Sequence, residues 1–557
     1  MAYFIKASET MYDAYVGKAK ANTNPDQYDW DRAMASPYVA EFLQAAQIKL
    51  KALGVHETWF EDLKSNAINK IINSQWVFTI KRTASGKIKK FKARIVLRGD
   101  QMDNIDQTTG KERDNASPVA AWPTIRLFLV TSIRNKWITT TIDFSNAFVQ
   151  SILPEDDPVW MHIPRGYKST KGPDYCLKLK KSLYGHKRAP LLWFEHLAEV
   201  FGKLGLKQSK FDPCLWYGKD IMVVQYVDDC GIAAPNQARI DKFISDLKDI
   251  GLQLTQEESF SKFLGIQFKH HDDGTVELTQ QGLIDKTLMA ANMSDCNPNA
   301  LPALLTALGS DKTGPSMDET WSYHGICGML LYLSTNTRPD ISFAVSQVCR
   351  FGHDPKKSHA SAVKTILRYL KKTRDKGILV NTNNNLYKLN LYCDADMAGL
   401  FGRKDPANPD SVRSRTGYII FLGGWPIIWK SQLQTCITTS TFESEYVALS
   451  SSLKVFLPLK WLAMEMIERT SGPFIKDTRI LATVFEDNQS AFYLATNQKI
   501  TNRTRYLLCR WHWFWDLYNK KEFAIVKCPT DKMKADYLTK GTPKEGFESN
   551  RLSVQGW

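Results

Sequence analysis

The spacing of apolar and polar positions changes several times along this chain, and the changes separate predicted helices from predicted strands. From Tyr38 to Leu53, Ala, Leu and Lys recur as in an amphipathic helix, so residues 1–70 are expected to be mainly helical. Two later runs predict strands: Trp76–Ile80 is rich in β-forming residues, and in Phe91–Leu97 the charged Lys92 and Arg94 alternate with apolar residues. Ser85-Gly86 between them predicts the turn of a hairpin.

The middle of the chain contains a second predicted hairpin with an unusual turn. Pro123–Arg134 is expected to be helical, and Trp137–Asp143, rich in β-branched residues, is expected to be a strand. Two further apolar strands, Ile221–Val227 and Gly231–Ala234, flank the adjacent aspartates at 228 and 229. The pattern therefore places two carboxylates between strands whose other side chains are apolar.

Beyond the second hairpin the pattern is first helical and then strand-like again. The Pro-, Ser- and Asn-rich stretch 294–315 predicts a loop, and the polar run 381–385 predicts a linker between domains. The remaining predicted elements are, in chain order, a helix over Ile240–Ile250 that Gly251 ends, a helical region up to Thr373, strands at Leu389–Cys393 and Gly417–Leu422, a helix from Phe442, and a strand at Ile480–Phe485.

Length and composition narrow the class of protein. The chain has 557 residues, which indicates three or more compact units. Its net charge of +15 and pI near 9.1 suit a polyanionic partner, although a solvated basic surface explains them equally well. Ten cysteines lie scattered without a CxxC pair, so neither a disulfide framework nor a zinc knuckle is expected, and a reducing compartment is.

Targeting signals and membrane spans are not expected from the sequence. The amino terminus MAYFIKASET has no basic stretch followed by a long apolar core, unlike a signal peptide. No apolar run approaches the ~18 residues needed to cross a bilayer, and the strongest, Ile125–Ile133, is expected to be a core helix. We therefore expect a soluble protein that does not enter a membrane.

Asp228 and Asp229 are the first candidates for chemistry. At an effective dielectric of 20, two charges ~4 Å apart repel by about 4 kcal/mol, so paired aspartates in an apolar hairpin favour bound cations. Nucleotidyl transfer uses such carboxylates to hold Mg²⁺, and Asp143 at the end of a predicted strand is a candidate third ligand. The alternative is an ordinary β-turn, in which Asp is common.

The residues around this turn form an ordered set that resembles a known family. The set consists of Trp76-Val-Phe-Thr-Ile-Lys-Arg, Lys92-Ala-Arg-Ile-Val96, Ser117-Pro-Val, Asp143-Phe-Ser-Asn-Ala-Phe148, Leu183-Tyr-Gly-His-Lys-Arg-Ala-Pro190, Tyr226-Val-Asp-Asp229, Phe263-Leu-Gly-Ile266, Thr337-Arg-Pro-Asp340 and Leu367-Arg-Tyr-Leu370. Together these motifs resemble the copia-type (pseudovirus) Pol protein of LTR retrotransposons over roughly residues 70–540.

The resemblance implies a multidomain α+β and α/β chain: a right-hand polymerase with fingers, palm and thumb, a connection, and a ribonuclease H-like domain. The expected segments are a helical leader (1–70), fingers and palm (71–239), a thumb-like helical region (240–300), the connection (301–385), the ribonuclease H-like domain (386–545) and a tail (546–557).

The resemblance also implies roles for residues of the polymerase. Asp143, Asp228 and Asp229 would be the metal ligands, and Phe148 would lie under the incoming sugar, where a bulky ring excludes a 2′-hydroxyl. The other implied substrate-binding residues are Lys81, Lys92, Arg94, Tyr184, Gly185 and Tyr226. Phe148 is alternatively a core aromatic, and each basic residue is alternatively a solvated strand charge.

One polymerase motif departs from the family pattern. The usual LYGLKQAPR run reads LYGHKRAPLLW here, so His186, Arg188 and Leu191 are unusual. His186 could be interpreted as a catalytic base, but we favour a substitution within a loop.

The carboxyl-terminal region resembles the family's ribonuclease H. Its implied metal ligands are Asp394, Glu445, Asp487 and Asp536, although each alone could be a helix cap or a surface charge. Supporting motifs are Arg415-Thr-Gly-Tyr418, Trp429-Lys-Ser431 and Asp487-Asn-Gln-Ser490, and the competing carboxylates within the motifs are Asp396 and Glu443. The departures are Met397, which replaces a Trp, and the run 503–508, which lacks a typical His and Asp; His512 remains at a family position.

The resemblance implies an RNA- and DNA-directed DNA polymerase with ribonuclease H activity, using two Mg²⁺ (or Mn²⁺) ions in each active site. Implied partners are an RNA template, a DNA primer, the RNA–DNA hybrid, dNTPs, and other Pol and Gag products. The expected location is a cytoplasmic virus-like particle, with entry of the complex into the nucleus. The alternatives are a catalytically inactive nucleic-acid-binding remnant and a host-domesticated interaction protein. No Asp-Ser/Thr-Gly triplet or His/Cys zinc cluster indicates a protease or integrase, so a processed product, fragment or relic of a polyprotein is expected.

Overall fold

A computed structural model describes residues 26–82, 87–103, 110, 112, 114–257, 261–273, 275–381, 387–401, 411–470, 480–501 and 511–557. The chain forms two compact units. Among the described residues, the first unit, called here the N-terminal unit, comprises those within 26–120 and 139–257; the second, the C-terminal unit, comprises those within 121–138 and 261–557. The predicted turn at Ser85-Gly86, residues 382–385 of the predicted linker and the run 503–508 lie outside the described residues.

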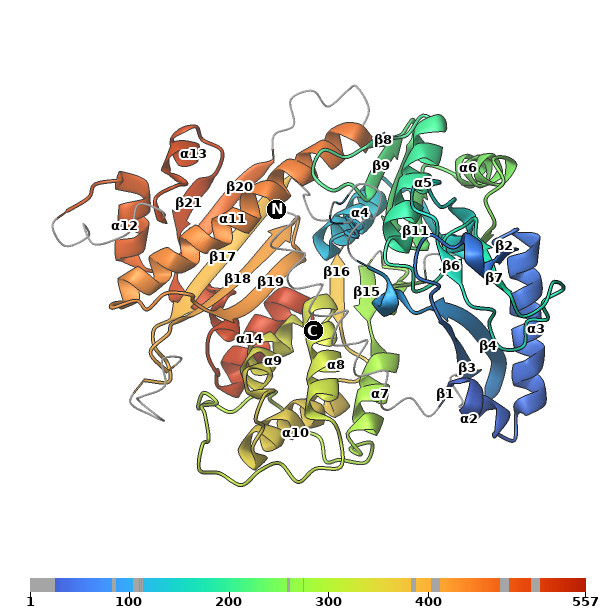
Figure 1. The fold of residues 1–557 in the computed structure, drawn as a ribbon. Coiled ribbons are helices and arrows are strands. Elements are labelled where there is room, and N and C mark those ends of the chain that lie inside the picture. The colour runs from blue at the N-terminus through green and yellow to red at the C-terminus, as the bar shows by residue number, and fades with distance from the viewer. Residues whose placement is uncertain are drawn as a thin grey trace. The chain divides into compact units, whose positions relative to one another are not determined.

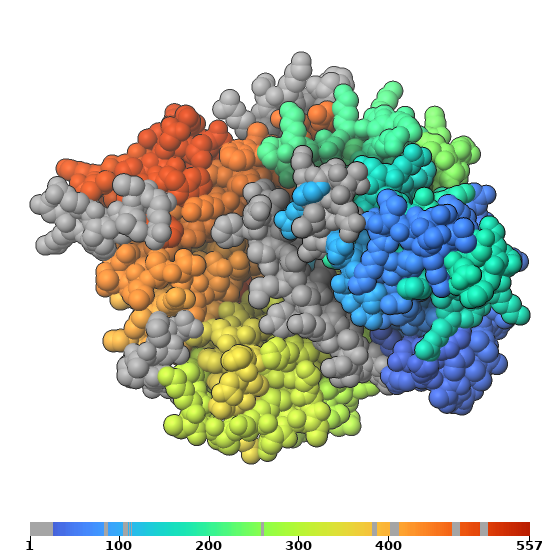
Figure 2. Space-filling model, viewed as in Figure 1, coloured from blue at the N-terminus to red at the C-terminus, as the bar shows by residue number. Residues whose placement is uncertain are grey.

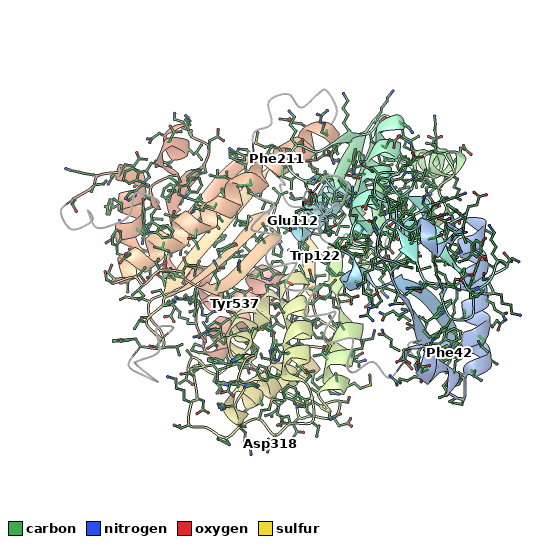
Figure 3. All side chains as sticks on the ribbon, in the orientation of Figure 1. Phe42, Glu112, Trp122, Phe211, Asp318 and Tyr537 are labelled. Carbon is green, nitrogen blue, oxygen red and sulfur yellow. The ribbon has the colours of Figure 1, made fainter. Side chains whose placement is uncertain are left out.

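The first layer of the N-terminal unit is a small sheet covered by a helix. Strands β1 (Gln27–Tyr28), β3 (Ser74–Arg82) and β4 (Ile88–Leu97) pair in the order β1-β3-β4, and α2 (Trp30–Met34) and α3 (Val39–Val55) accompany them (Figure 1). Phe42 of α3 is labelled in Figure 3, and its ring lies 5.2 Å from that of Phe78 and 5.1 Å from that of Phe91. The predicted helix and both predicted strands are confirmed here.

A second, three-stranded sheet corrects the expectation for residues 1–70. Strand β2 (Trp59–Leu63) pairs with β7 (Tyr175–Leu179), which also pairs with β6 (Trp160–Met161). The expectation of mainly helical structure is therefore wrong from Trp59 onward. The reason is that pairing with a strand more than 100 residues away stabilises an extended conformation that local spacing does not reveal.

The largest sheet of the N-terminal unit has the strand order β12-β5-β11-β10-β9-β8. Its strands are β5 (Ile138–Phe144), β8 (Lys207–Gln208), β9 (Leu215–Gly218), β10 (Ile221–Tyr226), β11 (Asp229–Ala234) and β12 (Leu254–Gln256). Helices α5 (Ala189–Lys203) and α6 (Gln237–Asp249) pack on it, and their Trp193, Phe201 and Phe243 share one apolar core with Val223 and Ile232. The predicted hairpin and the predicted helix over 240–250 are confirmed.

The C-terminal unit contains a helical part beside a four-stranded sheet. The sheet has the order β13 (Lys262–Phe263), β14 (Ile266–His270), β15 (Thr275–Thr279) and β16 (Ile378–Asn381). The helices are α4 (Trp122–Arg134), α7 (Gln281–Ala290), α8 (Tyr323–Asn336), α9 (Ser342–Val348), α10 (Lys357–Lys372) and α14 (Lys544–Gln555). The helical region expected between 315 and 373 is confirmed.

The other sheet of the C-terminal unit has five strands in the order β19-β18-β17-β20-β21. The strands are β17 (Lys388–Asp396), β18 (Arg415–Leu422), β19 (Trp425–Leu433), β20 (Leu481–Glu486) and β21 (Ala524–Lys527). The sheet is mixed: β17 pairs antiparallel with β18 on one side and parallel with β20 on the other. The accompanying helices are α11 (Thr441–Thr470), α12 (Gln489–Asn497) and α13 (Trp515–Asn519).

Helix α11 corrects the expectation about apolar segments. Among the helices that the structure describes, only α11 is long and apolar enough to cross a membrane by length and composition, with a window of mean hydropathy 1.3. That window is 67% buried, and α11 packs along β17, β18 and α4, as Figure 1 shows for the sheet. It is therefore a core helix. The segment Ile125–Ile133 lies in α4, where most of its residues are buried, so the expectation of a core helix there is confirmed.

The mixed α/β architecture in several parts is as predicted. The named subdomains stay a prediction, and two of their expected borders fall inside helices: 239/240 lies within α6 and 545/546 within α14.

Candidate active sites

Strand pairing in the N-terminal unit brings Asp143, Asp228 and Asp229 to one region of its largest sheet. Asp143 lies in β5, and the amide nitrogen of the following residue, Phe144, donates a 3.0 Å hydrogen bond to the carbonyl oxygen of Asp228. Asp229 begins β11 and is the cross-strand partner of Tyr226. The two-residue turn between β10 and β11 therefore presents Asp228 beside the strand that carries Asp143.

The turn that carries Asp228 has an unusual backbone. Val227 has a φ of 55°, in the left-handed region that β-branched residues rarely adopt. The indole nitrogen of Trp193 donates a 2.8 Å hydrogen bond to the carbonyl oxygen of Val227. A buried helix residue thus contributes to holding the turn in a conformation that its own sequence disfavours.

Burial and mutual repulsion disfavour the negative charges of the two adjacent aspartates. Burial raises the pKa of Asp229 to about 7, and repulsion from Asp228 and Asp143 adds to this shift. Burial also raises the pKa of Asp228, with a further contribution from Asp143. A cation bound between these carboxylates would relieve the repulsion, so the donor set fits a divalent metal. Glu257, which follows β12 and also raises the pKa of Asp229, is a fourth carboxylate that the sequence did not reveal.

Basic residues of β4 oppose these carboxylates. Lys92 and Arg94 are two positions apart on the strand, and the intervening Ala93 is buried, so both project from the other face. Both cations lower the pKa of Asp228. Burial lowers the pKa of Lys92, and so do the charges of Arg94 and Lys81, whereas Asp143 raises it. Lys92 and Arg94 thus act on the carboxylates, and Lys81 lies on the neighbouring strand β3, opposite Lys90.

The loop of Tyr184 and Gly185 packs against the end of β4. The amide nitrogen of Leu97 donates a 2.7 Å hydrogen bond to the carbonyl oxygen of Tyr184. Gly185 has a φ of 87°, and a Cβ there would lie 2.1 Å from the carbonyl oxygen of Leu97, so only glycine fits. Burial raises the pKa of Tyr184 to about 12, with Asp228 contributing.

Phe148 and Tyr226 lie at the border of this region. The ring of Phe148 meets that of Tyr184 edge-on, with 4.8 Å between centroids, and it also packs against the apolar core of the sheet. These contacts fit a core aromatic, and the role of Phe148 as a sugar contact stays a prediction. Tyr226 is half-buried at the end of β10.

The departures at 186–191 are accommodated structurally. His186 is buried within the loop, Arg188 lies 3.4 Å from the Asp157 carboxylate in an ion pair, and Leu191 is part of α5. This agrees with a loop substitution at His186.

The C-terminal unit brings three of the four predicted nuclease ligands together. One carboxylate oxygen from each of Asp394, Glu445 and Asp487 lies within 4.8 Å of the others. Asp394 lies on β17, Glu445 on α11 near its start, and Asp487 directly after β20. The parallel pairing of β17 with β20 and the packing of α11 on β17 explain why residues so distant in sequence meet. Among the described residues, this is the group of carboxylates close enough to share one ion; Asp143, Asp228 and Asp229 do not reach that spacing.

Burial disfavours the negative charges of two members of this trio, Asp394 and Glu445. Burial raises the pKa of Asp394 to about 6, although a hydrogen bond from the Thr539 hydroxyl opposes the shift. Burial and repulsion from Asp394 raise the pKa of Glu445 well above its usual range. One carboxylate oxygen of Glu445 is buried without a hydrogen-bond partner among the described residues. A buried acceptor of this kind fits a metal ion as its partner.

Asp536 lies beside the trio and not within it. It begins the short 3₁₀ helix Asp536–Leu538, repels Asp394, and forms an ion pair of 2.5 Å with Lys540. Gly417 of β18 permits this approach, because a Cβ there would lie 2.6 Å from the Thr539 side chain. Lys540 was not among the predicted residues, and its ammonium group also acts on Asp394 and Asp396.

The competing carboxylates have different surroundings. The carboxylate of Glu443 accepts a 2.7 Å hydrogen bond from the amide nitrogen of Thr439, so it caps the start of α11. Asp396 lies at the end of β17 opposite Arg415 and is half-buried. The Glu443 carboxylate is thereby engaged at the helix start, whereas Asp396 stands two residues after Asp394 on β17, and both aspartates act on Lys540.

Two further residues complete the surroundings of the trio. Glu486, the last residue of β20, is fully buried and raises the pKa of Glu445. The sequence indicates only the end of a strand at this position and not a buried carboxylate. His512 accepts or donates a 2.9 Å hydrogen bond at the Tyr446 hydroxyl and packs 4.3 Å from the ring of Trp515. This residue at a family position therefore contacts α11 at Tyr446, the residue that follows Glu445.

The sequence is similar to reverse transcriptases and to retrotransposon Pol polyproteins. Residues 57–305 match the family model described as reverse transcriptase (RNA-dependent DNA polymerase). The chain is 31% identical over 86% of its length to a retrovirus-related Pol polyprotein from transposon RE1 of Arabidopsis thaliana. It is 29% identical over 92% of its length to that from transposon TNT 1-94 of Nicotiana tabacum. It spans 31% and 38% of these two relatives, about a third of their length. A foamy viral protease-reverse transcriptase in complex with dsDNA aligns with a TM-score of 0.48 at 13% identity, covering 88% of this chain and 83% of that one.

Proposed function

The chain belongs to the copia-type retrotransposon Pol family, and we propose that it is an RNA- and DNA-directed DNA polymerase with a separate ribonuclease H centre. The observation that carries the polymerase assignment is the group of mutually repelling carboxylates at Asp143, Asp228 and Asp229, opposed by the cations of β4. Such a group is costly unless it binds cations and an anionic substrate.

In this proposal Asp143, Asp228 and Asp229 hold two Mg²⁺ or Mn²⁺ ions. Bound there, the ions supply the positive charge that activates a primer 3′-hydroxyl and stabilises the leaving pyrophosphate. Lys92 and Arg94 neutralise phosphate charge from the opposite side. Tyr184 and Phe148 form an aromatic border against which a nucleoside can pack, and the hydrogen bond from Trp193 keeps the Asp228 turn in place.

The same reasoning supports a nuclease in the C-terminal unit. Asp394, Glu445 and Asp487 would hold a divalent ion, which supplies charge to activate water against a phosphodiester. Asp536 would serve a second ion once its ion pair with Lys540 opens. The partners follow from this chemistry: an RNA template with a DNA primer, dNTPs and the RNA–DNA hybrid, all polyanions that suit the +15 net charge.

Family membership also motivates proposals about the setting of this activity. We propose that the protein acts with other Pol and Gag products in a cytoplasmic virus-like particle, and that the resulting complex enters the nucleus. Co-sedimentation of the protein with Gag in particle fractions tests this setting.

The rival is an inactive remnant that binds nucleic acid without turnover. Loss of function would remove the selection that keeps repelling carboxylates together, yet seven candidate ligands remain. The test is extension of a labelled DNA primer on a homopolymer RNA template, with Mg²⁺ and with Mn²⁺ in separate reactions. We expect extension with at least one ion. Tight binding of the template-primer without extension under either ion would favour the remnant.

A further inference from the structure

Lys49 is a buried lysine on the inner face of α3. The side chain is only 8% exposed, and it lies on the face formed by Phe42, Ala45, Ala46 and Leu53. The helix itself reaches the surface of the N-terminal unit, in blue in Figure 2, so solvent-facing positions were available for a lysine. Lysine is rarely buried unless its charge has a partner.

The ammonium group of Lys49 contacts two loops that border the candidate polymerase centre. It donates a 2.6 Å hydrogen bond to the side-chain oxygen of Asn146, and it lies 5.6 Å from the ring centroid of Tyr184. Asn146 has a φ of 56° and stands between Asp143 and Phe148. Lys49 thereby connects the turn after the metal-ligand strand to the aromatic pair beside it.

The charge of Lys49 has no acidic partner among the described residues. The ionised groups that act on it are the cations Lys92 and Arg94, which together with burial lower its pKa to about 8. An amide oxygen and a ring face orient the ammonium group, but neither carries a formal negative charge. Three cations that converge on one partly dehydrated region repel one another, and an anion bound among them would remove that cost.

We propose that Lys49, Lys92 and Arg94 form an anion-binding cluster for the polyphosphate chain of the incoming nucleotide. The inference deepens the proposed polymerase function and rests on it. Its new element is Lys49, which comes from a helix that precedes the matched family segment at residues 57–305. Asn146 holds the ammonium group in place, so that the cation is positioned before the nucleotide arrives.

Inorganic tripolyphosphate is the probe that tests the cluster without catalysis. Its affinity for the full-length protein is measured by calorimetry for the parent and for Lys49→Met, with Lys51→Met as the matched control. Lys51 lies two residues further along α3 and is exposed. We expect Lys49→Met to weaken binding by about tenfold or more, Lys49→Arg to retain most of it, and Lys51→Met to leave it unchanged within about twofold. Thermal unfolding identifies any variant that has not folded, and Lys49→Gln then replaces Lys49→Met.

The outcomes separate this inference from the polymerase assignment. Equal tripolyphosphate affinity of Lys49→Met and Lys51→Met overturns the cluster. So does unchanged affinity accompanied by altered choice between ribonucleotides and deoxynucleotides, which would make Lys49 solely a positioning residue for Phe148. Lys49-dependent binding in a protein that extends no primer supports the anion cluster and overturns the polymerase function.

Discussion

The indole nitrogen of Trp193 donates a hydrogen bond to the carbonyl oxygen of Val227, across 34 residues of sequence, and so reaches the turn that presents Asp228. A valine in the left-handed region costs on the order of 1–3 kcal/mol, and it persists only where surrounding contacts favour it. The position of a metal-ligand candidate therefore depends on a core tryptophan that does not itself reach the carboxylates.

Replacing Trp193 by Phe should slow nucleotide addition. A lost hydrogen bond of about 1 kcal/mol net corresponds to roughly a fivefold lower rate if the turn must be re-formed for each addition. Single-nucleotide extension at saturating dNTP measures the effect. Trp216→Phe is the matched control, because the Trp216 indole nitrogen is buried without a hydrogen-bond partner among the described residues. Equal losses in both variants would mean that volume, and not the hydrogen bond, matters.

Asp229→Asn should stabilise the metal-free protein, and more at high pH than at low pH. The pKa of Asp229 is raised from 3.8 to about 7 in the folded state. Protonated Asp229 therefore contributes stability to the folded state. This contribution is complete below about pH 4 and is lost as the pH rises through about 7. With EDTA present at pH 8, we expect the melting temperature of Asp229→Asn to exceed that of the parent by roughly a few degrees. Near pH 4 the two melting temperatures should match.

Added Mg²⁺ should reverse the order at pH 8, because it stabilises the parent and not the variant. The exposed Asp241 supplies the control, since Asp241→Asn should show no comparable pH dependence. A constant difference between Asp229→Asn and the parent across this pH range would contradict the repulsion described above.

Local pattern and family motifs predicted the elements that depend on neighbouring residues. The hairpin around Asp228 was predictable because its apolar runs are short and end at polar residues. Motifs suggested the candidate ribonuclease H ligands, but the closeness of Asp394 to Glu445 and Asp487 follows only from the parallel pairing of β17 with β20 and the packing of α11.

Residues whose burial depends on distant segments were missed. Lys49 looks like any lysine of an amphipathic helix, and its inner position is set by a turn 97 residues away. Glu486 looks like the charged end of a strand, and it is buried because β20 lies inside the sheet, beside Cys393 of β17. The strand β2 was predicted as helix because its partner β7 lies far along the chain. In each case the missing information is tertiary.

Phe148→Ala should admit ribonucleotides if this ring borders the 2′ position of the incoming sugar. The expected result is a gain of about tenfold or more in the ratio of ribonucleotide to deoxynucleotide incorporation, because a cavity replaces the ring. Competing kcat/KM values for UTP and dTTP measure it. Phe144→Leu, within the core beside Trp193, is the control and should change both substrates alike. A parallel fall for both substrates in Phe148→Ala would leave Phe148 as a core aromatic only.

Glu445→Gln should abolish hybrid cleavage, and Glu443→Gln should not. Glu445 belongs to the carboxylate trio, whereas the Glu443 carboxylate accepts hydrogen bonds from Thr439 at the helix start. We expect a loss of about a hundredfold or more for Glu445→Gln, and less than about threefold for Glu443→Gln, whose amide oxygen can still accept the cap hydrogen bond. Release of labelled RNA from a preformed hybrid measures both. Comparable losses in the two variants would show that the choice of Glu445 over Glu443 as the metal ligand is wrong.

If one chain carries two independent centres, Asp228→Asn should separate their activities. A neutral amide cannot replace a charged metal ligand, so this variant should lose DNA synthesis while the nuclease trio is unaltered. The measurement uses a single hybrid with labels of different colour on the DNA primer and the RNA template, so that extension and cleavage are read from the same reaction. We expect Asp228→Asn to leave the primer unextended and to cleave the RNA at the parent's rate. Primer extension at the parent's rate by purified, folded Asp228→Asn would contradict this expectation.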